Sequence, residues 1–540
     1  MIAAGVLLTL VAGSVCARAA EEQPLAPVPP MGWNDWAHYQ CGFTAQTILE
    51  NARALVKTGL AARGYNTVTI DDCWMQKDRD AEGNLQADPG RFPNGMKPVA
   101  DAVHALGLKF GIYEDSGWET CGRFAGSGEP KGGGADHFLQ DAKLFASWGV
   151  DYLKLDGCNV YVPQKGEENA AYRKAYAAEA AALKQVGRPI VFSESAPAYF
   201  QGTPDWYDVL TWVREYGQLW REGTDIEIFR KADPDRSRFK SMQWNYSYNL
   251  PLGRFQRPGN WNDADFIIGG DDGLTVAESR TQMALWSMMS APLILSSDLS
   301  SLSKEAIGIV GNKAVIAVDQ DPLGKMATLV RRSATTDVLF KTLSGGEYAV
   351  AAFNRGTTPL DVTIQPADLG FSANCRFDAR ELWTGKHQSK TAELKANVAT
   401  HDTAMWKIRP EAGCGTPPRM GTITMITTGE ENRDIADYGL CMAASGRTES
   451  CTGNSDETWT VSDDGALQSG GQCLAVAEGK VAMQACSAGA AQKWNYNLVG
   501  NLINASDHQC LSSNPGSGPD ALSIQACGNN LPNQIWSLPN

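Results

Sequence analysis

The sequence predicts an α/β chain: a (β/α)8 barrel, then an antiparallel β-sandwich, then a C-terminal β-trefoil. Residues 30–318 alternate short apolar runs with helix-like segments, which is typical of βα units. The helical pattern stops near residue 323, and a cysteine-rich pattern recurs three times after about residue 415. These changes predict a barrel at 27–320, a sandwich at 323–411 and a third unit, built from three repeats, at 415–540.

The barrel prediction depends on eight apolar runs. The candidate strands are residues 32–36, 67–72, 109–115, 151–156, 189–194, 209–214, 261–266 and 293–298. Helical patterns such as 138–148 and 170–185 lie between them. Seven runs carry an acidic residue at or near their C-terminal end, where a (β/α)8 barrel builds its active site. A single such acid would be read as a helix cap, but seven together favour a functional rim.

Short strand-like runs at 337–341 and 348–353 predict the sandwich. The C-terminal region repeats two cysteines and a tryptophan with a period of about forty residues, which indicates a repeat architecture. Cys375 and Cys414 are left over, and their pairing is open. The three repeated cysteine pairs are Cys441/Cys451, Cys473/Cys486 and Cys510/Cys527, followed by Trp459, Trp494 and Trp536.

The N-terminus has the features of a secretory signal peptide. Residues 3–15 are apolar, and small residues near position 19 offer a cleavage site, so we expect residues 1–19 to be removed. The alternative, a membrane anchor, is disfavoured because the run is short. Loss of Cys16 would leave twelve of thirteen cysteines, an even number suited to disulfides in a secreted, extracellular protein. Asn245 and Asn504 stand in N-glycosylation sequons, relevant in a eukaryotic host.

Composition excludes several classes of partner. Acidic residues outnumber basic ones by 61 to 47, giving a net charge of −14, so a nucleic-acid partner is not expected. The six histidines form no recognisable metal-ligand pattern, and we expect neither a metal nor a cofactor. Residues 283–295 are apolar but interrupted by serines and Pro292, so they are predicted to be core and not a membrane span. A neutral ligand such as a sugar fits this charge.

The run 152–158, YLKLDGC, supplies the strongest candidate for a catalytic residue. Hydrolysis of a glycosidic bond needs one carboxylate to attack and one carboxylic acid to protonate the leaving oxygen. Asp156 is the candidate nucleophile, and Lys154, two residues earlier on the same strand face, would keep it ionised. The alternative is a buried salt bridge between these two residues.

Asp225 is the candidate acid, because it lies in a loop-like segment where a carboxyl group could reach across the rim. An aromatic neighbour and a nearby anion would raise its pKa for that role, although a helix cap would look the same in sequence. Asp71 and Asp72 would accept hydrogen bonds from sugar hydroxyls. Trp33 and Tyr113 would pack against the sugar ring, unless they are simply core.

Residues 29 to about 410 resemble the family 27 glycoside hydrolases, the α-galactosidase and α-N-acetylgalactosaminidase group. The matching strings are PPMGWN (29–34), IDDCW (70–74), GIY (111–113), YLKLDGC (152–158), WR (220–221) with Asp225, and NWNDAD (260–265). The resemblance implies an α-galactosidase that acts by double displacement with retention, on terminal α-galactosyl residues of oligosaccharides or polysaccharides.

The resemblance also implies roles for individual residues. Asp156 would be the nucleophile and Asp225 the acid/base, while Asp71 and Asp72 would bind the 4- and 6-hydroxyls. Further sugar contacts would come from Lys154, Arg221 and Asp265. The two barrel disulfides would be Cys41–Cys73 and Cys121–Cys158.

The residues at the end of the fifth predicted strand do not decide whether the sugar carries a hydroxyl or an acetamido group at its 2-position. In the galactosidase pattern a glutamate there contacts the 2-hydroxyl. If Pro197 and Tyr199 set the register, Ser195 and Ala198 take the places of larger residues, as in the N-acetylgalactosaminidase pattern, and leave room for a 2-acetamido group. A shift of one residue would make Glu194 the 2-hydroxyl partner instead. Galactose is favoured because most of the family prefers it.

The C-terminal repeat resembles a ricin-type β-trefoil, which often binds carbohydrate. Each lobe of that module usually carries an aspartate two residues after its first cysteine, but here those positions are Ala443, Ala475 and Ser512. Glycan binding by this unit and a purely structural role both remain open. Two other classes are disfavoured: a glycosyltransferase built on the DAD string at 263–265, which lacks a glycine-rich nucleotide turn, and a non-catalytic binding protein, which would not need both Asp156 and Asp225.

Overall fold

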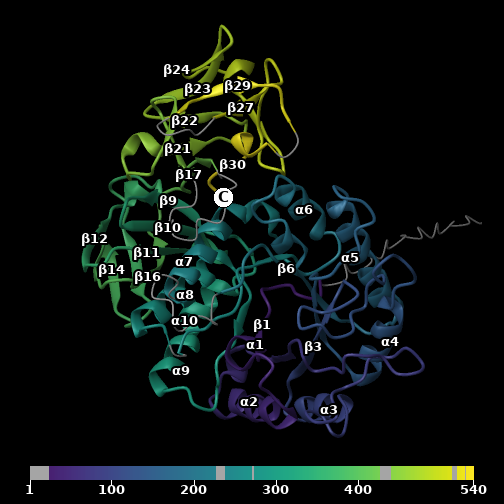
Figure 1. The fold of residues 1–540 in the computed structure, drawn as a ribbon. Coiled ribbons are helices and arrows are strands. Elements are labelled where there is room, and N and C mark those ends of the chain that lie inside the picture. Colours follow the sequence, from purple (N-terminus) through teal and green to yellow (C-terminus); the bar gives the residue numbers. More distant parts are fainter. Residues whose placement is uncertain (1–23, 227–237, 271–272, 426–439, 514–519, 529–530) are drawn as a thin grey trace, which may run out of the picture.

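The computed structural model describes residues 24–226, 238–270, 273–425, 440–513, 520–528 and 531–540. The expected signal peptide, residues 1–19, lies outside the described residues. Three units follow one another along the chain (Figure 1): a barrel in purple to teal, a β-sandwich in green and a β-rich unit in yellow-green. None of the helices in the described ranges combines the length and the apolar character needed to cross a membrane.

Eight parallel strands form the barrel, in the order β7-β6-β5-β4-β3-β2-β1-β8. The first strand pairs with both the second and the eighth, and a parallel bridge between Ile267 and Leu295 joins the seventh-strand region to the eighth. A side chain at Gly32 would lie 2.5 Å from the Thr67 carbonyl oxygen, so the close approach of β1 and β2 requires glycine. The strands are β1 Met31–Asn34, β2 Thr67–Ile70, β3 Lys109–Asp115, β4 Tyr152–Asp156, β5 Val191–Glu194, β6 Leu219–Arg221, β7 Trp261–Asp263 and β8 Leu293–Leu295.

Helices cover the outside of this sheet (Figure 1). They are α1 Trp36–Tyr39, α2 Ala45–Lys57, α3 Lys97–Ala105, α4 Phe138–Trp148, α5 Glu168–Gln185, α6 Trp206–Val213, α7 Arg238–Asn249, α8 Val276–Met289, α9 Lys304–Val310 and α10 Lys313–Asp319. Helix α8 is buried along most of its length, which explains the apolar run predicted to be core. Short 3-10 helices are η1 Ala61–Arg63, η2 Ala196–Tyr199 and η3 Leu250–Phe255.

The sixth predicted strand was wrong. Residues 209–214 fall in and just after helix α6, and the sixth strand is β6, only three residues long. Most of α6 is buried, so its sequence shows a continuous apolar run that periodicity cannot distinguish from a buried strand. The other seven predicted runs each overlap a strand of the barrel.

The sandwich packs a six-stranded antiparallel sheet, in the order β14-β13-β16-β11-β10-β9, with a two-stranded sheet of β12 and β15. Val350, Ile364, Phe377 and Leu394 are buried in its core. The disulfide between Cys375 and Cys414 joins the end of this unit to its interior. Its elements are β9 Thr328–Arg332, β10 Thr336–Thr342, η4 Ser344–Gly346, β11 Tyr348–Asn354, β12 Leu360–Ile364, η5 Pro366–Leu369, β13 Phe377–Glu381, β14 His387–Thr391, β15 Leu394–Val398 and β16 Thr403–Pro410.

The C-terminal unit has a threefold pattern of hydrogen bonds. In each repeat the tryptophan indole N–H donates to the carbonyl of the residue after the first cysteine: Trp459 to Met442, Trp494 to Leu474 and Trp536 to Leu511. Three short disulfide loops accompany this pattern, Cys441–Cys451, Cys473–Cys486 and Cys510–Cys527.

A second equivalent contact lies two residues before each tryptophan. Gln492 and Gln534 accept from the backbone N–H of the residue after the second cysteine, and Glu457 does the same in the first repeat. The first repeat thus makes with a glutamate the accepting contact that the other two make with a glutamine. The described elements are β17 Arg419–Thr422, β18 Thr424–Met425, β19 Leu440–Ala443, β20 Arg447–Glu449, η6 Ser455–Glu457, β21 Thr458–Val461, β22 Leu467–Ser469, β23 Gln472–Ala477, β24 Lys480–Ala485, η7 Ala490–Gln492, β25 Trp494–Tyr496, β26 Leu502–Asn504, β27 Cys510–Ser512, β28 Asp520–Ala521, β29 Ser523–Gln525, η8 Pro532–Gln534 and β30 Trp536–Ser537.

The C-terminal unit also contacts the barrel directly. The Arg254 guanidinium donates to the carbonyls of Leu498 at 2.9 Å and Val499 at 2.8 Å. Ile535 is fully buried and belongs to the same apolar cluster as the barrel core. The Ser537 hydroxyl donates to the Pro251 carbonyl at 3.1 Å. These contacts make the unit an integral neighbour of the barrel and not a loosely tethered appendage.

Candidate active site

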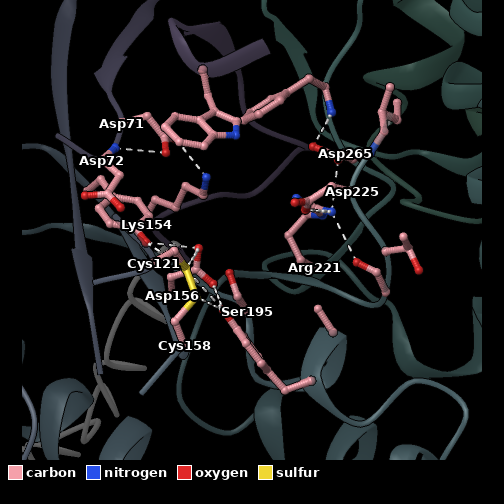
Figure 2. A pocket seen from close by; sticks show the side chains of 18 residues that line it. Asp71, Asp72, Cys121, Lys154, Asp156, Cys158, Ser195, Arg221, Asp225 and Asp265 are labelled. Carbon is pink, nitrogen blue, oxygen red and sulfur yellow. Dashed lines mark hydrogen bonds and ion pairs between the residues drawn. A yellow bond between two sulfur atoms is a disulfide. The ribbon is translucent and has the colours of Figure 1, made fainter. Parts of the chain in front are cut away.

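A cavity of about 410 Å³ lies at the mouth of the barrel, where the carboxyl ends of the strands meet. Figure 2 shows acidic and basic side chains from several strands converging on it. Both candidate catalytic carboxylates, Asp156 and Asp225, line this one cavity. The lining residues are Trp36, Asp71, Asp72, Tyr113, Cys121, Lys154, Asp156, Cys158, Ser195, Ala198, Tyr199, Arg221, Gly223, Thr224, Asp225, Ile226, Asp265 and Phe266.

Asp156 ends strand β4, and its carboxylate is held from several sides. The Tyr113 hydroxyl donates to Oδ2 at 3.1 Å, the Tyr199 hydroxyl donates to Oδ1, and the Gly157 N–H donates to Oδ1 at 3.1 Å. Burial raises the pKa of Tyr113 and Tyr199 well above its usual range, and repulsion from the Asp156 charge is the second cause. Both phenols therefore keep their protons and remain donors that aim the Asp156 carboxylate.

Lys154 points into the same pocket from strand β4, but its closest partner is Asp71. Its Nζ donates to Asp71 Oδ2 at 2.7 Å, and Asn34 Nδ2 donates to the same oxygen at 2.7 Å. Burial would lower the pKa of Lys154, but attraction to Asp71 and Asp156 outweighs burial and raises the pKa above its usual range. Lys154 therefore stays a cation near both carboxylates, and its ion pair is with Asp71, whereas the alternative interpretation of the sequence pairs it with Asp156.

Asp72 and Asp265 are nearly inaccessible to solvent and have altered acidity. Burial raises the pKa of Asp72 to about 6, against hydrogen bonds from the Gly122 and Cys73 N–H groups that lower it. Burial also raises the pKa of Asp265 to about 6; Arg221 lowers it and the Asp225 charge raises it further. Two pocket carboxylates therefore change charge in the mildly acidic range.

Arg221 contacts both Asp225, the candidate acid, and Asp265. It ends strand β6, and its Nη2 lies 2.9 Å from Asp225 Oδ1 and 2.9 Å from Asp265 Oδ2. The Asp225 side chain is 66% exposed, whereas that of Asp265 is 2% exposed. The charged neighbours of Asp225 thus include a cation as well as the anion that the sequence predicted.

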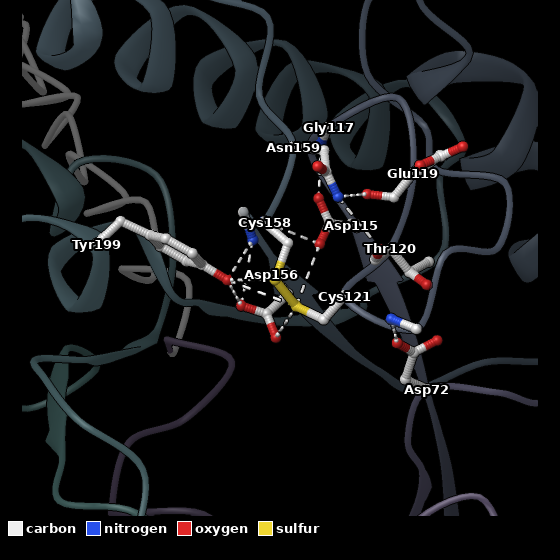
Figure 3. The surroundings of a disulfide bond; sticks show 12 residues. Asp72, Asp115, Gly117, Glu119, Thr120, Cys121, Asp156, Cys158, Asn159 and Tyr199 are labelled. Atoms are coloured by element: carbon white, nitrogen blue, oxygen red, sulfur yellow. Dashed lines mark hydrogen bonds between the residues drawn. A yellow bond between two sulfur atoms is a disulfide. The ribbon is translucent and has the colours of Figure 1, made fainter.

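The disulfide between Cys121 and Cys158 forms part of the pocket wall beside the nucleophile candidate (Figure 3). Cys121 Sγ lies 3.6 Å from Asp156 Oδ2, and the Cys158 N–H donates to Asp115 Oδ2 at 3.0 Å. These two sulfurs and the carboxylates of Asp115 and Asp156 cluster within 4.8 Å of one another. Because both sulfurs are bonded to each other, they offer no thiolate to a metal. A second disulfide, Cys41–Cys73, joins the loops after β1 and β2.

Trp33 was wrongly predicted to contact the sugar. It is fully buried, and its indole N–H donates to the Ser297 carbonyl at 2.8 Å. Neighbouring residues on a strand face opposite sides, and it is the Asn34 side chain that contacts the pocket residue Asp71. The pocket tryptophan is Trp36, which begins helix α1 beyond the strand.

Ser195, and not Glu194, faces the pocket at the end of β5. Ser195 and Ala198 both line the cavity. Glu194 points the other way, where its Oε1 lies 2.2 Å from the position that a side chain at Gly217 would occupy. Full burial raises the pKa of Glu194 well above its usual range. The wall near the expected sugar 2-position therefore carries two small residues.

The structure contradicts glycosylation at Asn245 and Asn504. Both side chains are fully buried. The Asn245 amide donates to the Thr224 carbonyl at 3.2 Å and the Ala264 carbonyl at 3.1 Å, and the Asn504 amide donates to the Ala491 carbonyl at 3.0 Å. A glycan is attached through this amide nitrogen, which must face solvent. A sequon alone does not report burial.

Several pocket residues carried no sequence signal of their own. Tyr199 and Trp36 reach the pocket from short helices, and Phe266 lies in the turn after β7. Thr224 and Ile226 flank Asp225. Tyr199 could have been found as the aromatic residue just after the fifth strand, but its contact with Asp156 depends on how the turn η2 folds.

The three units match known domain families. The family models are those described as Alpha galactosidase A over residues 28–321, Alpha galactosidase C-terminal beta sandwich domain over 333–408, and Ricin-type beta-trefoil lectin domain over 434–536. The first match covers the barrel and its pocket.

Full-length relatives and solved structures give the same assignment. Alpha-galactosidase A of Aspergillus niger is 38% identical over 533 residues, which cover 96% of this chain and 93% of that protein. The crystal structure of alpha-galactosidase I from Mortierella vinacea matches with a TM-score of 0.64 at 29% identity, covering 72% of this chain and 98% of that chain. The alpha-galactosidase of Saccharomyces cerevisiae with raffinose matches with a TM-score of 0.62 at 25% identity, covering 72% and 100%.

The raised pKa of Asp72 predicts a pH dependence of substrate affinity. As the pH falls through about 6, Asp72 takes up a proton and becomes a weaker acceptor for a sugar hydroxyl. A loss of about 1 kcal/mol would raise KM about fivefold below that pH. Steady-state kinetics on an aryl α-galactoside from about pH 4 to pH 8 measure this change. In Asp72→Asn the high KM should persist at all pH values; a wild-type KM that is flat across this range would contradict the role of Asp72.

Proposed function

The chain belongs to the Alpha galactosidase A family of glycoside hydrolases, and on that premise we propose that it removes terminal, non-reducing α-D-galactosyl residues from oligosaccharides and polysaccharides with retention of configuration. The observation that carries this proposal is one cavity lined by both Asp156 and Asp225. Cavities of this size hold small ligands such as a single sugar residue.

The first step is attack by Asp156. Its carboxylate forms a bond to the anomeric carbon as the bond from that carbon to the leaving oxygen breaks, and Asp225 gives its proton to that oxygen. The result is a galactosyl ester of Asp156 and an ionised Asp225. The two tyrosine hydroxyls that hold Asp156 support this assignment, because a nucleophile must be aimed before the sugar arrives.

The second step releases the sugar. Asp225, now ionised, takes a proton from a water molecule, whose oxygen bonds to the anomeric carbon as the Asp156 carboxylate leaves. The exposed position of Asp225 supports this role, because both the leaving group and the incoming water must reach it. Arg221, beside it, carries a matching positive charge when Asp225 is ionised.

The remaining pocket charges serve to recognise the sugar. Asp71 and Asp72, at the end of β2, accept from the 4- and 6-hydroxyls, and Asp265 accepts from a further hydroxyl on the opposite wall. Lys154 and Arg221 donate. Buried carboxylates that already hold a cation bind hydroxyls tightly, because little reorganisation is needed when substrate enters.

We also propose that the protein is secreted. Six disulfides among the described residues support this, since such bonds persist in oxidising compartments. The role of the C-terminal unit is proposed as structural support first and glycan binding second. Ala443, Ala475 and Ser512, at the positions where a trefoil lobe usually carries an aspartate, are all buried and offer no carboxylate to a sugar.

One observation favours a second substrate, an α-N-acetylgalactosaminide. Ser195 and Ala198 line the pocket where a larger pair would close it, and Glu194 is turned away. A recess beside the 2-position would admit an acetamido group. Hydrophobic space of this kind discriminates weakly, so acceptance of both sugars is expected.

The acid/base role of Asp225 is tested by its substitution with alanine. Asp225→Ala should lower kcat/KM for an unactivated α-galactosyl disaccharide by about 100-fold or more, because the leaving oxygen needs a proton. For a dinitrophenyl α-galactoside, whose leaving group needs none, the loss of kcat/KM should be much smaller. Equal losses on the two substrates would contradict the acid role.

The second substrate is tested by filling the recess. Wild-type protein should hydrolyse both p-nitrophenyl α-galactoside and p-nitrophenyl α-N-acetylgalactosaminide. Ser195→Glu should lower kcat/KM for the acetamido sugar by about 10-fold or more relative to that for galactose, since the longer side chain occupies its space. A wild-type protein with no activity on the acetamido sugar would reject the second substrate while leaving the first intact, and an unchanged ratio in Ser195→Glu would contradict the role of the recess.

A further inference from the structure

We infer that Asn245 is a positioning residue for catalysis: its buried amide holds the loop that carries Asp225 and the turn that carries Asp265 in fixed register. This inference rests on the proposed acid/base role of Asp225. Asn245 lies on helix α7, behind the pocket wall, and does not itself line the cavity.

The Asn245 amide joins two strand-end segments through one nitrogen. Its Nδ2 donates to the Thr224 carbonyl at 3.2 Å and to the Ala264 carbonyl at 3.1 Å. Thr224 directly precedes Asp225, and Ala264 directly precedes Asp265. A single fully buried side chain thus connects the residue before the acid with the residue before a sugar-binding carboxylate.

Thr224 is held at every polar atom that the backbone and side chain offer. The Tyr248 hydroxyl, also from α7, donates to the Thr224 carbonyl at 3.2 Å. On the other side, Gln201 Oε1 accepts from the Thr224 N–H at 2.8 Å and from its hydroxyl at 2.7 Å. A side chain on Gly223 would lie 2.4 Å from Gln201 Oε1, so it would displace the amide that holds Thr224. Thr224 is therefore fixed to two separate parts of the barrel.

The backbone on the far side of Asp225 is fixed as well. The Ile226 N–H donates to Asp265 Oδ2 at 2.7 Å. Between these anchors the Asp225 side chain itself is largely exposed and contacts the Arg221 guanidinium. This differs from Asp156, whose carboxylate is held directly by two tyrosines. The aim of Asp225 therefore depends on one side-chain contact, from Arg221, and on its backbone, which the Thr224 contacts fix.

The turn that carries Asp265 also needs an external anchor. Asp265 has a φ of 77°, in the left-handed region that costs free energy for a residue other than glycine. Such a conformation persists only where the surroundings fix it. Asn245 holds the carbonyl before it, and the Trp286 indole N–H donates to the Asp265 carbonyl at 2.8 Å. Loss of the Asn245 amide would loosen both segments that face the sugar.

The experiment compares two alanine variants of one helix. Asn245→Ala should lower kcat/KM for an unactivated α-galactosyl disaccharide by about 10- to 100-fold, since a displacement near 1 Å at a catalytic group costs that much. For a dinitrophenyl α-galactoside the loss should be several-fold smaller, because that leaving group does not depend on the aim of Asp225. This dependence on the leaving group is a readout that a merely structural role would not produce.

Asn249→Ala is the matched control. Asn249 is buried on the same helix, one turn later, and its amide donates to the Asn245 carbonyl within the helix, not to either catalytic segment. Asn249→Ala should lower kcat/KM only slightly, and by the same factor for both substrates.

If Asn245→Ala also lowers kcat/KM by the same factor for both substrates, or lowers it for neither, the inference is overturned. If Asp225→Ala itself shows no dependence on the leaving group, the proposed function fails first; if Asp225→Ala shows it and Asn245→Ala does not, only the positioning role fails.

A second variant covers the case in which Asn245→Ala does not fold. Tyr248→Phe removes only one hydroxyl, the other donor to the Thr224 carbonyl. It should show the same dependence on the leaving group with a smaller loss of kcat/KM, on the order of a few-fold. Equal kcat/KM ratios for Tyr248→Phe and wild type on the two substrates would overturn the inference independently.

Discussion

The closure of eight parallel strands is the constraint on which the whole site depends. Pairing of β1 with both β2 and β8, completed by the bridge from Ile267 to Leu295, forces the carboxyl ends of all strands to one mouth. Asp71, Asp156 and Arg221 end or follow separate strands, β2, β4 and β6, and meet only because the sheet closes. A flat sheet of the same strands would leave these groups in a row, with no pocket between them.

Two buried cations lie among the carboxylates at this mouth. Lys154 and Arg221 each lie between two carboxylates: Lys154 near Asp71 and Asp156, Arg221 near Asp225 and Asp265. A buried charge without a partner would cost several kcal/mol, so each cation stabilises the acids that chemistry and recognition require. The same arrangement leaves Asp225 more exposed than the others, which suits its proposed role of exchanging protons with substrate and water.

Much of this site could be predicted from the sequence, since strand alternation and an acid at the strand end are local features. The run containing Lys154 and Asp156 became β4, with both side chains in the pocket. The failures needed long-range information. β6 has only three residues, too few to show a periodicity, and the buried helix α6 has an apolar sequence that predicts a strand. Trp33 lies within β1 and Trp36 lies beyond its end, and the sequence does not show where that strand ends. Asn245 stands in a sequon, and its burial depends on contacts with Thr224 and Ala264, which are distant in the sequence.

The proposed mechanism requires the Asp156 carboxylate to form a covalent bond to the anomeric carbon. The most direct measurement treats the full chain with an α-galactosyl fluoride that carries fluorine in place of the ring C5 hydrogen, which slows release of the ester. Proteolysis and mass spectrometry then locate the adduct. We expect one galactosyl adduct per chain, on the peptide that contains Asp156. An adduct on another carboxylate, or rapid release of the β-anomer with no adduct, would contradict it.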